Sequence, residues 1–193
     1  MEDCGDGISD MRIANADEFD KIFSIMKESF PVDEYRTYEE QKALLDNPKY
    51  AIHVVPDAES ENVKAFITVW QFANFAFVEH FAVNSVYRNQ GLGSQMLHEI
   101  FEMVSCRLCL EVELPETDFA KRRIGFYKRN GFFENDYPYI QPAFSEDKNP
   151  VPLIMMTSRG RVSEECFEKM KEIIYTEVYK VGGGKPKLRE TKQ

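Results

Sequence analysis

The stretch from Val83 to Ser94 has the residue types of an anion-binding loop at the start of a helix. An apolar strand leads into a polar loop that contains Gly91 and Gly93, and an amphipathic helix follows at once. The first N–H groups of a helix have no partner within it, and the helix dipole is positive at this end. Glycines let a phosphate approach the backbone closely, and Arg88 adds a charged donor. The stretch therefore predicts a phosphate site.

Two familiar glycine loops are excluded by details of this stretch. A P-loop needs Gly-Lys-Ser or Gly-Lys-Thr, and the stretch contains no lysine. A dinucleotide fingerprint needs a third small residue where Met96 stands, and it opens a parallel βαβ array instead of following a meander. A glycine turn that only caps a helix stays open as an alternative on the local pattern.

Glu79 and His80 are titratable neighbours on an otherwise apolar strand, 77–83. Strict alternation along a strand places these two side chains on opposite faces of the sheet, so only one of them can face a given site. On that alternation Glu79 shares its face with apolar side chains, where a charge suggests a function. The structural alternative for either residue is a satisfied polar group on a sheet face beneath a helix.

Hydrophobic periodicity predicts the elements that hold these residues. We expect helices that begin at Asn15 or Asp17, at 38–45, 91–105, 117–130 and 163–179. We expect strands at 11–14, 50–55, 63–72, 77–83, 107–114, from 132, and 153–157, with 137–144 as a loop or irregular edge. Three antiparallel strands followed by β-α-β-α-β predict a mixed α/β sheet within one domain, 11–181, with an added C-terminal helix.

Two motifs in this order resemble a known family. The segment Arg88–Gly93 (R-x-x-G-x-G) resembles the acyl-CoA pyrophosphate loop of the GCN5-related N-acetyltransferases, the GNAT superfamily. The segment Phe126–Phe132 (F-Y-x-x-x-G-F) resembles the signature that follows the next strand in that family. The resemblance covers roughly residues 11–157, including the element order. It departs at Ala120, where many members carry an asparagine, and Thr117 or Asp118 is a candidate substitute.

The resemblance implies a GNAT-like domain whose central strands splay apart to admit acetyl-CoA. We expect no metal, because the C-x-x-C pair Cys106 and Cys109 has no second pair or histidine ligands nearby in the sequence. It implies that Ala82 and Val83 offer strand-edge backbone groups to the pantetheine arm, and that Tyr127 protonates the departing thiolate. The pyrophosphate would be held by the backbone amides of Arg88, Asn89, Gln90, Gly91, Leu92, Gly93 and Ser94.

The implied reaction is direct transfer of an acetyl group to a primary amine of a small molecule or peptide. An amine must lose a proton before it attacks, so a general base is required. We expect the base to be Glu79, then Glu111, then His80; Glu111 is a candidate because some family members use a carboxylate on this strand.

In folds of this kind the acceptor pocket is built from the first two helices and the late loops. Here these are the segments 30–38 and 137–144, which are rich in aromatic and acidic side chains. Such a lining suits a cationic amine by charge and by cation–π contact. We expect the acceptor to contact Tyr35, Tyr38, Tyr137 and Tyr139.

Composition limits the other functions. The 193 residues carry a formal net charge of −9, which argues against nucleic acid as the main partner. No apolar run is long enough to span a membrane and no signal peptide is visible, so we expect a cytoplasmic protein. The ends, 1–10 and 182–193, are expected to be an N-terminal extension and a flexible basic tail, the latter with a small chance of a contact role.

Three hypotheses remain to be separated. The first is the N-acetyltransferase, and the second is an acyl-CoA sensor or interaction module of the same fold without turnover. The third, an acetyltransferase acting on nucleic acid, would need a basic face, and only the tail is basic. The helix 163–179 is expected to pack on the domain or on a second copy, so a homodimer is an alternative.

Overall fold

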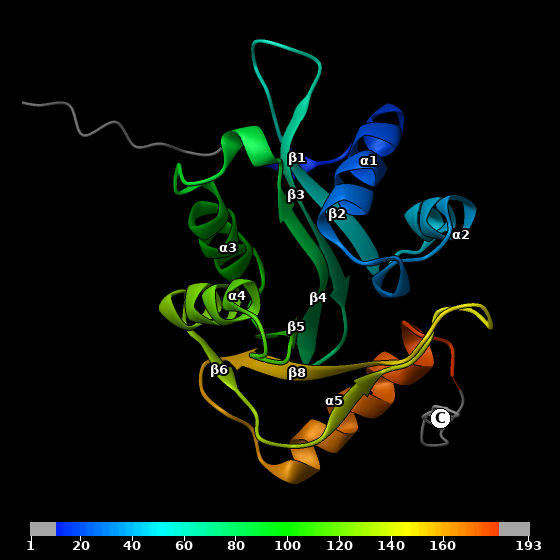
Figure 1. Ribbon diagram of the computed structural model, residues 1–193, viewed down its shortest axis with the longest axis vertical. Coiled ribbons are helices and arrows are strands. Elements are labelled where there is room, and N and C mark those ends of the chain that lie inside the picture. Colours follow the sequence, from blue (N-terminus) through cyan, green and yellow to red (C-terminus); the bar gives the residue numbers. More distant parts are fainter. Residues whose placement is uncertain (1–10, 182–193) are drawn as a thin grey trace, which may run out of the picture.

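The computed structural model describes residues 11–181 as a twisted mixed sheet with helices on both faces (Figure 1). The helices are α1 (Phe19–Ser29), α2 (Tyr38–Ala43), α3 (Leu92–Met103), α4 (Asp118–Arg129) and α5 (Glu164–Glu177). The strands are β1 (Arg12–Ile13), β2 (Tyr50–Pro56), β3 (Val63–Gln71), β4 (Phe75–Val83), β5 (Arg107–Glu113), β6 (Phe132–Glu134), β7 (Tyr139–Gln141) and β8 (Val151–Ser158). Short 3-10 turns are η1 (Ala16–Glu18), η2 (Val32–Glu34), η3 (Leu44–Asp46) and η4 (Ser85–Tyr87). The predicted extension and tail, 1–10 and 182–193, lie outside the described residues.

The predicted mixed α/β sheet is confirmed, largely because the caps and periodicities act locally. Asn15 forms a capping box with Glu18 at η1, Thr37 caps α2, and the Ser163 hydroxyl accepts from the first turn of α5. The segment 137–144 differs from the prediction, since its residues 139–141 form β7. That strand exists because β8 offers it a partner, with Ile140 opposite Pro152, which local propensity does not reveal.

The sheet order is β1-β2-β3-β4-β5-β8-β6, with β7 also paired to β8. Strands β1 to β4 are antiparallel, β4 and β5 are parallel, and β5 and β8 are antiparallel. The parallel pair joins the N-terminal meander to the C-terminal half. Helix α3 forms the crossover between β4 and β5 that a parallel pair requires.

Each face of the sheet has its own apolar layer. Helices α1 and α2 lie on one side of the sheet in Figure 1, and α3 and α4 lie on the other. The first layer joins α1 and α5 to the sheet and centres on fully buried side chains that include Trp70, Phe77 and Phe167. The second joins α3 and α4 to the sheet through Met96, Leu97 and Phe132.

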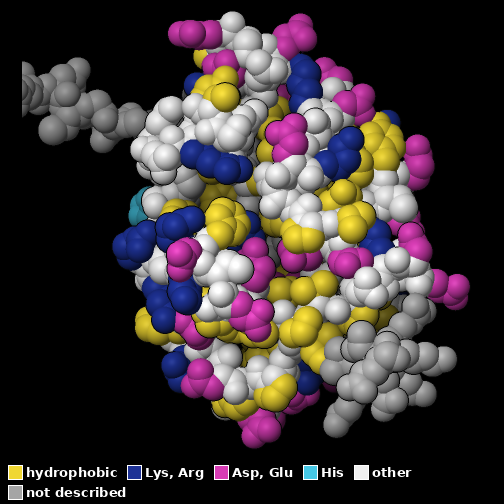
Figure 2. Space-filling view, in the orientation of Figure 1, with side chains coloured by type: hydrophobic (Ala, Val, Ile, Leu, Met, Phe, Trp, Pro, Cys, Tyr) yellow, Lys and Arg dark blue, Asp and Glu magenta, His cyan; other side chains and the backbone are white. Residues whose placement is uncertain are grey.

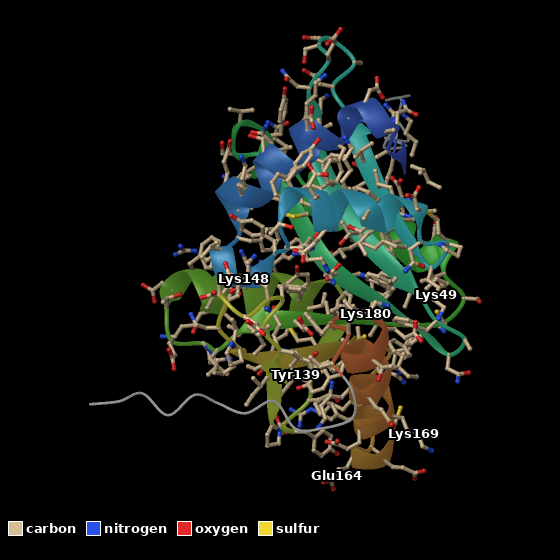
Figure 3. All side chains as sticks on the ribbon, turned by 90° about the vertical axis from the view of Figure 1, so that its right-hand side faces the viewer. Lys49, Tyr139, Lys148, Glu164, Lys169 and Lys180 are labelled. Atoms are coloured by element: carbon tan, nitrogen blue, oxygen red, sulfur yellow. The ribbon has the colours of Figure 1, made fainter. Side chains whose placement is uncertain are left out.

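Helix α5 packs on the same chain. Figure 3 shows it running from Glu164 towards the sheet, with Lys180 just beyond its C-terminal end. Its inward face buries Phe167, Met170 and Ile174 against the first layer. Packing on the domain is thus what the structure shows, and a homodimer stays a prediction. Among the described helices, none combines the length and the apolarity that a membrane crossing requires.

Candidate active site

The central strands separate midway along their length. The parallel pairing of β4 with β5 extends only from Phe75 and Arg107 to Val78 and Leu110. The next residues on the two strands are Glu79 and Glu111, so both carboxylates stand where the sheet forks. A cavity of about 20 Å³ lies there, the size of one water molecule. It is lined by Phe30, Glu34, Glu79, His80, Glu111, Val112, Glu113, Arg123, Gln141 and Leu153.

A β-bulge determines which way the residues of β4 face. Ile67 pairs with Phe81 and Val69 pairs with Val78, so β4 has one more residue than β3 between these pairs. Glu79 and His80 therefore both oppose Thr68, whose hydroxyl accepts from the His80 N–H at 2.8 Å. The prediction that Glu79 and His80 lie on opposite faces is wrong, because the inserted residue interrupts the alternation. Both line the cavity.

Glu79 is held as a buried ion pair. Its Oε1 lies 2.6 Å from Arg36 Nη1, and its Oε2 accepts from Trp70 Nε1 at 2.8 Å. The two charged side chains are only 8% (Arg36) and 1% (Glu79) exposed. Burial alone would raise the pKa of Glu79, but Arg36 and the other partners outweigh it and hold the pKa below its usual value. Glu79 is therefore an ionised carboxylate with little tendency to take a proton.

His80 has a defined tautomer in its neutral form. Its Nε2 lies 2.8 Å from the carbonyl oxygen of Glu34, which can only accept a hydrogen bond, so Nε2 carries the hydrogen. Its Nδ1 is then an acceptor, and it is buried without a hydrogen-bond partner among the described residues, 3.9 Å from Glu79 Oε2. Burial lowers the pKa of His80, against the opposing effect of Glu79. The ring presents a lone pair at the fork.

Glu111 has hydrogen-bond donors, and none of the described residues is a cationic partner for it. Tyr139 donates its hydroxyl to Oε1, and Tyr179 donates to Oε2 at 2.7 Å. Burial raises the pKa of Glu111 to about 7, although the two hydroxyl donors lower it. At neutral pH this carboxyl is therefore close to half-protonated, which suits a group that exchanges protons.

Two further carboxylates line the same cavity. Burial, followed by repulsion from Glu113, raises the pKa of Glu34 to about 7. Glu113 Oε1 accepts from Arg123 Nη1 at 2.7 Å, and its Oε2 is buried without a hydrogen-bond partner among the described residues. Figure 2 shows acidic side chains near the centre of this face, with Lys and Arg side chains gathered over α4. The fork is thus negatively charged.

The loop after β4 has the conformation that an anion site needs. Asn84 caps η4, and Arg88 Nε donates to the Val83 carbonyl at 3.0 Å. Gly91 is the N-cap of α3 at φ +80°, in the left-handed region that favours glycine. Asn89 also has positive φ, +63°. The first N–H groups of α3, in the predicted segment Leu92, Gly93 and Ser94, are consequently gathered at the end of this loop, where Gln90 precedes the cap.

Gly93 allows α3 and α4 to approach each other. A Cβ atom at this position would lie 3.2 Å from Phe126 Cζ of α4 and 3.5 Å from Phe81 Cζ of β4. The two glycines therefore have separate roles, since a Cβ on Gly91 would meet nothing within 4 Å.

The edge of β4 that faces the fork has backbone groups not used by β3. The Asn84 N–H donates to the Lys64 carbonyl on the β3 side at 2.9 Å. Backbone hydrogen-bonding groups alternate between the two edges of a strand. The N–H and C=O of Ala82 therefore also point to β3, and those of Phe81 and Val83 point to the opposite edge. Of the predicted pair, Val83 thus has its backbone groups at the fork, where Arg88 already occupies its carbonyl.

Tyr127 is buried on the inward face of α4. Its ring contacts Phe126 and Phe132, with centroids 5.3 and 5.7 Å away. Burial raises its pKa to about 12, with opposite effects from Arg123 and Glu113. The hydroxyl therefore stays protonated at neutral pH.

Thr117 and Asp118 are the candidate substitutes for the asparagine that many family members carry where this chain has Ala120. Thr117 is already engaged, because its Oγ1 accepts from the Ala120 N–H as the cap of α4.

The four tyrosines expected around an acceptor are dispersed. Only Tyr139 contacts a candidate base, Glu111. Tyr38 donates to Asp20 and packs on α1, Tyr35 packs on Phe23, and Tyr137 packs on α5.

Sequence reasoning missed several residues at the fork. Arg36, Trp70 and Arg123 bond to the carboxylates directly, and Tyr179 reaches Glu111 from beyond the end of α5. The spacing of Tyr175 and Tyr179, on the inward face of the last helix, was a signal for buried hydroxyl groups that need partners.

Comparison with known proteins adds the family. The model of the Acetyltransferase (GNAT) family matches residues 17–132. A solved structure described as a GNAT-family acetyltransferase from Bacteroides thetaiotaomicron is 31% identical, with a TM-score of 0.78. The match covers 89% of this chain and 98% of that chain. No curated protein matches the chain at a significant level.

More distant structures share the fold alone. The ribosomal-protein-S18-alanine N-acetyltransferase from Escherichia coli is 19% identical, with a TM-score of 0.56, covering 80% of this chain and 96% of that one. An aminoglycoside 6'-N-acetyltransferase in complex with coenzyme A is 15% identical, with a TM-score of 0.56 and coverage of 77% and 95%. The family model covers more than half of the chain, and the bacterial structure nearly all of it. The chain belongs to the GNAT family of acetyltransferases.

Proposed function

We propose that the protein is an acetyl-CoA-dependent N-acetyltransferase that acts on a primary amine of a small molecule or peptide. The observation that carries the proposal is Glu111, a partly buried carboxylate whose pKa is raised to about 7, at the fork between β4 and β5. The glycine loop before α3 leads away from the same strand, β4.

The residues around the loop fit acetyl-CoA. The N–H groups from Arg88 to Ser94 would hold its pyrophosphate at the N-terminus of α3, with Gly91 giving the loop its left-handed turn. Strand-edge groups near Val83 would hold the pantetheine arm. Acetyl-CoA, when bound, supplies the acetyl group as a thioester.

We assign the general base to Glu111. Deprotonating an amine with a pKa of about 10.4 at pH 7 costs ~4.6 kcal/mol, so the base must accept a proton readily. Glu79 is poorly suited because Arg36 holds it ionised, and the burial of His80 lowers its pKa. Glu79 would instead hold Arg36 in place beside the cavity, since the two charges balance each other.

We assign the general acid to Tyr127. Its hydroxyl is protonated at neutral pH, and transfer of that proton to the departing sulfur would make the thiol a better leaving group. A protonated amine loses two protons as it becomes an amide. Glu111 accepts the first and passes it to solvent, and the second, lost from the nitrogen after attack on the thioester, replaces the proton that Tyr127 gives to the sulfur. Each turnover therefore yields the amide, the thiol and one proton.

The acidic fork favours a cationic acceptor. Four carboxylates line the cavity, and the arginines paired with Glu79 and Glu113 neutralise only two of them. The remaining carboxyls, of Glu34 and Glu111, gain from a positive charge nearby because it favours their ionised form.

The test is thiol release from acetyl-CoA with a panel of aliphatic amines, diamines and a lysine peptide. Turnover should rise with pH through about 7, as Glu111 loses its proton, and the Glu111→Gln variant should lose most of it. The matched control is Glu116→Gln, which changes an exposed carboxylate and should retain full activity. Calorimetric binding of acetyl-CoA without release of thiol from any amine would favour the sensor and contradict the proposal.

A further inference from the structure

We propose that Tyr179, beyond the C-terminal end of α5, is a positioning residue that holds Glu111 in the orientation and ionisation state of a base. The inference rests on the proposed function of Glu111. Tyr179 itself lies outside residues 17–132, the part of the chain that the family model matches.

The contact is direct and partly buried. The Tyr179 hydroxyl donates to Glu111 Oε2 at 2.7 Å, across 68 positions of the sequence. Tyr179 is 6% exposed, and burial keeps the pKa of its hydroxyl well above the usual value, so the group remains a donor at any physiological pH. Hydrogen bonds from a neutral donor favour the charged form of a carboxylate. Tyr179 thus opposes the burial that raises the pKa of Glu111.

Three contacts hold Tyr179 at this position. Its own N–H donates to the Ile174 carbonyl at 3.1 Å, which ties it to the last turn of α5. Arg36 Nη2 donates to the Val178 carbonyl at 2.8 Å, so the arginine that pairs with Glu79 also holds the end of the helix. Phe144 packs on the Tyr179 ring, with centroids 5.0 Å apart. The hydroxyl therefore reaches Glu111 from a fixed support.

Glu111 has other titratable neighbours, which the test must separate from Tyr179. Tyr139 on β7 also donates to it, and Tyr175 on α5 lies near enough to interact electrostatically but donates instead to the Ile140 carbonyl. The groups that face Glu111 are Tyr139 from β7, Tyr175 from α5, Tyr179, Glu79 from β4, Glu34 from η2 and Cys109 on its own strand.

The experiment compares Tyr179→Phe with Tyr175→Phe, the same change one helical turn away. The Glu111 carboxyl carbon is titrated by NMR in protein labelled with ¹³C at glutamate, and its signal is identified by its absence in Glu111→Gln. Loss of the Tyr179 donor should raise the pKa of Glu111 by about one unit. Tyr175→Phe should leave the titration within about 0.2 units of the wild-type protein.

The same pair of variants is compared for pH dependence with the amine that turns over best. A shift of one unit from pH 7 leaves about one fifth of Glu111 ionised relative to the wild-type protein, so kcat/KM at pH 7 should fall about fivefold. It should recover nearly fully at pH 9. A merely structural role would lower activity equally at both pH values.

The NMR titration needs no turnover, so its outcome is independent of the proposed function. An unchanged Glu111 titration in folded Tyr179→Phe, or an equal shift in Tyr175→Phe, overturns the inference. A shifted titration in a protein that acetylates no amine supports the contact and overturns the proposed function instead.

Discussion

Replacing Arg36 with methionine isolates the buried ion pair at the fork. The substitution keeps much of the side-chain volume but removes the charge that faces Glu79 at 2.6 Å. Glu79 is then left buried with the Trp70 Nε1–H as its remaining strong donor. Removing one partner of a buried ion pair typically lowers the free energy of unfolding by roughly 3–5 kcal/mol, because the remaining charge is left uncompensated.

Protonation sets an upper bound on the cost that arises from Glu79. A buried glutamate can become neutral by binding a proton. This costs 1.36 kcal/mol for each pH unit above its unfolded pKa of about 4.3. The bound is therefore about 4.4 kcal/mol at pH 7.5 and about 1 kcal/mol at pH 5. The lost hydrogen bond to Val178 and the lost contact with the Phe144 ring add a part that does not depend on pH.

The sign of the pH dependence follows from the two pKa shifts. In the wild-type protein the pKa of Glu79 is lowered on folding, so its contribution is complete above pH 4.3, roughly, and is lost as the pH falls. In Arg36→Met the largest of the effects that oppose burial is gone, and we expect the folded pKa to rise above the unfolded one. The variant is then destabilised as the pH rises from about 4.3 through that raised pKa. The variant's loss of stability relative to wild type should therefore be smaller at pH 5 than at pH 7.5, by up to about 3 kcal/mol.

The assay is urea unfolding at both pH values, followed by the fluorescence of Trp70, the single tryptophan. The control is the double variant Arg36→Met/Glu79→Gln, in which a neutral amide can still accept from Trp70. The double variant should be destabilised to a similar extent at both pH values. A deficit in Arg36→Met that is equal at pH 7.5 and pH 5 would refute the reasoning.

Two further predictions concern the loop and α4. Gly91→Ala should weaken acetyl-CoA binding in calorimetry and cost about 1–2 kcal/mol of stability, because alanine is disfavoured at φ +80°. Gly125→Ala, within α4, should leave binding unchanged; equal binding by both variants would contradict the role of the loop. Tyr127→Phe should lower kcat by about 10²–10⁴-fold without changing acetyl-CoA affinity, if its hydroxyl is the acid. The control is Tyr137→Phe, which removes a hydroxyl that donates to the Val162 carbonyl and should retain activity. If Tyr127→Phe lost less activity than this control, Tyr127 would not be the acid.

The elements were predictable because their signals are local. The apolar face of α3, the cap at Gly91 and the Thr117 cap of α4 each depend on a few neighbouring residues. The same is true of the loop, where residue type and position alone indicate the left-handed turn. Strand β7 was missed because three residues with a proline nearby become a strand only when β8 is beside them.

The chemistry at the fork depends on contacts that no local pattern contains. Glu79 is paired with Arg36, 43 positions away, and Glu111 receives Tyr179, 68 positions away. The bulge was also missed, since alternation assumes that each strand residue has one partner. The sequence feature that indicated the bulge was the pair of adjacent polar residues on an apolar strand, because an inserted residue allows both side chains to lie on one face.

The neighbours of each carboxylate then decide its role. Arginines accompany Glu79 and Glu113. Within residues 11–181 no arginine is bonded to Glu111 or Glu34, and these two have pKa values of about 7. Environments that move the pKa values of similar groups apart are the usual means by which one site holds both a fixed charge and a base. Of the two groups with raised pKa, Glu111 alone accepts hydroxyl donors on both oxygens, from Tyr139 and Tyr179. The two hydroxyl donors fix the orientation of the carboxyl and leave it free to gain or lose a proton, whereas an arginine would keep it ionised. A base at neutral pH requires a group that can change its protonation state.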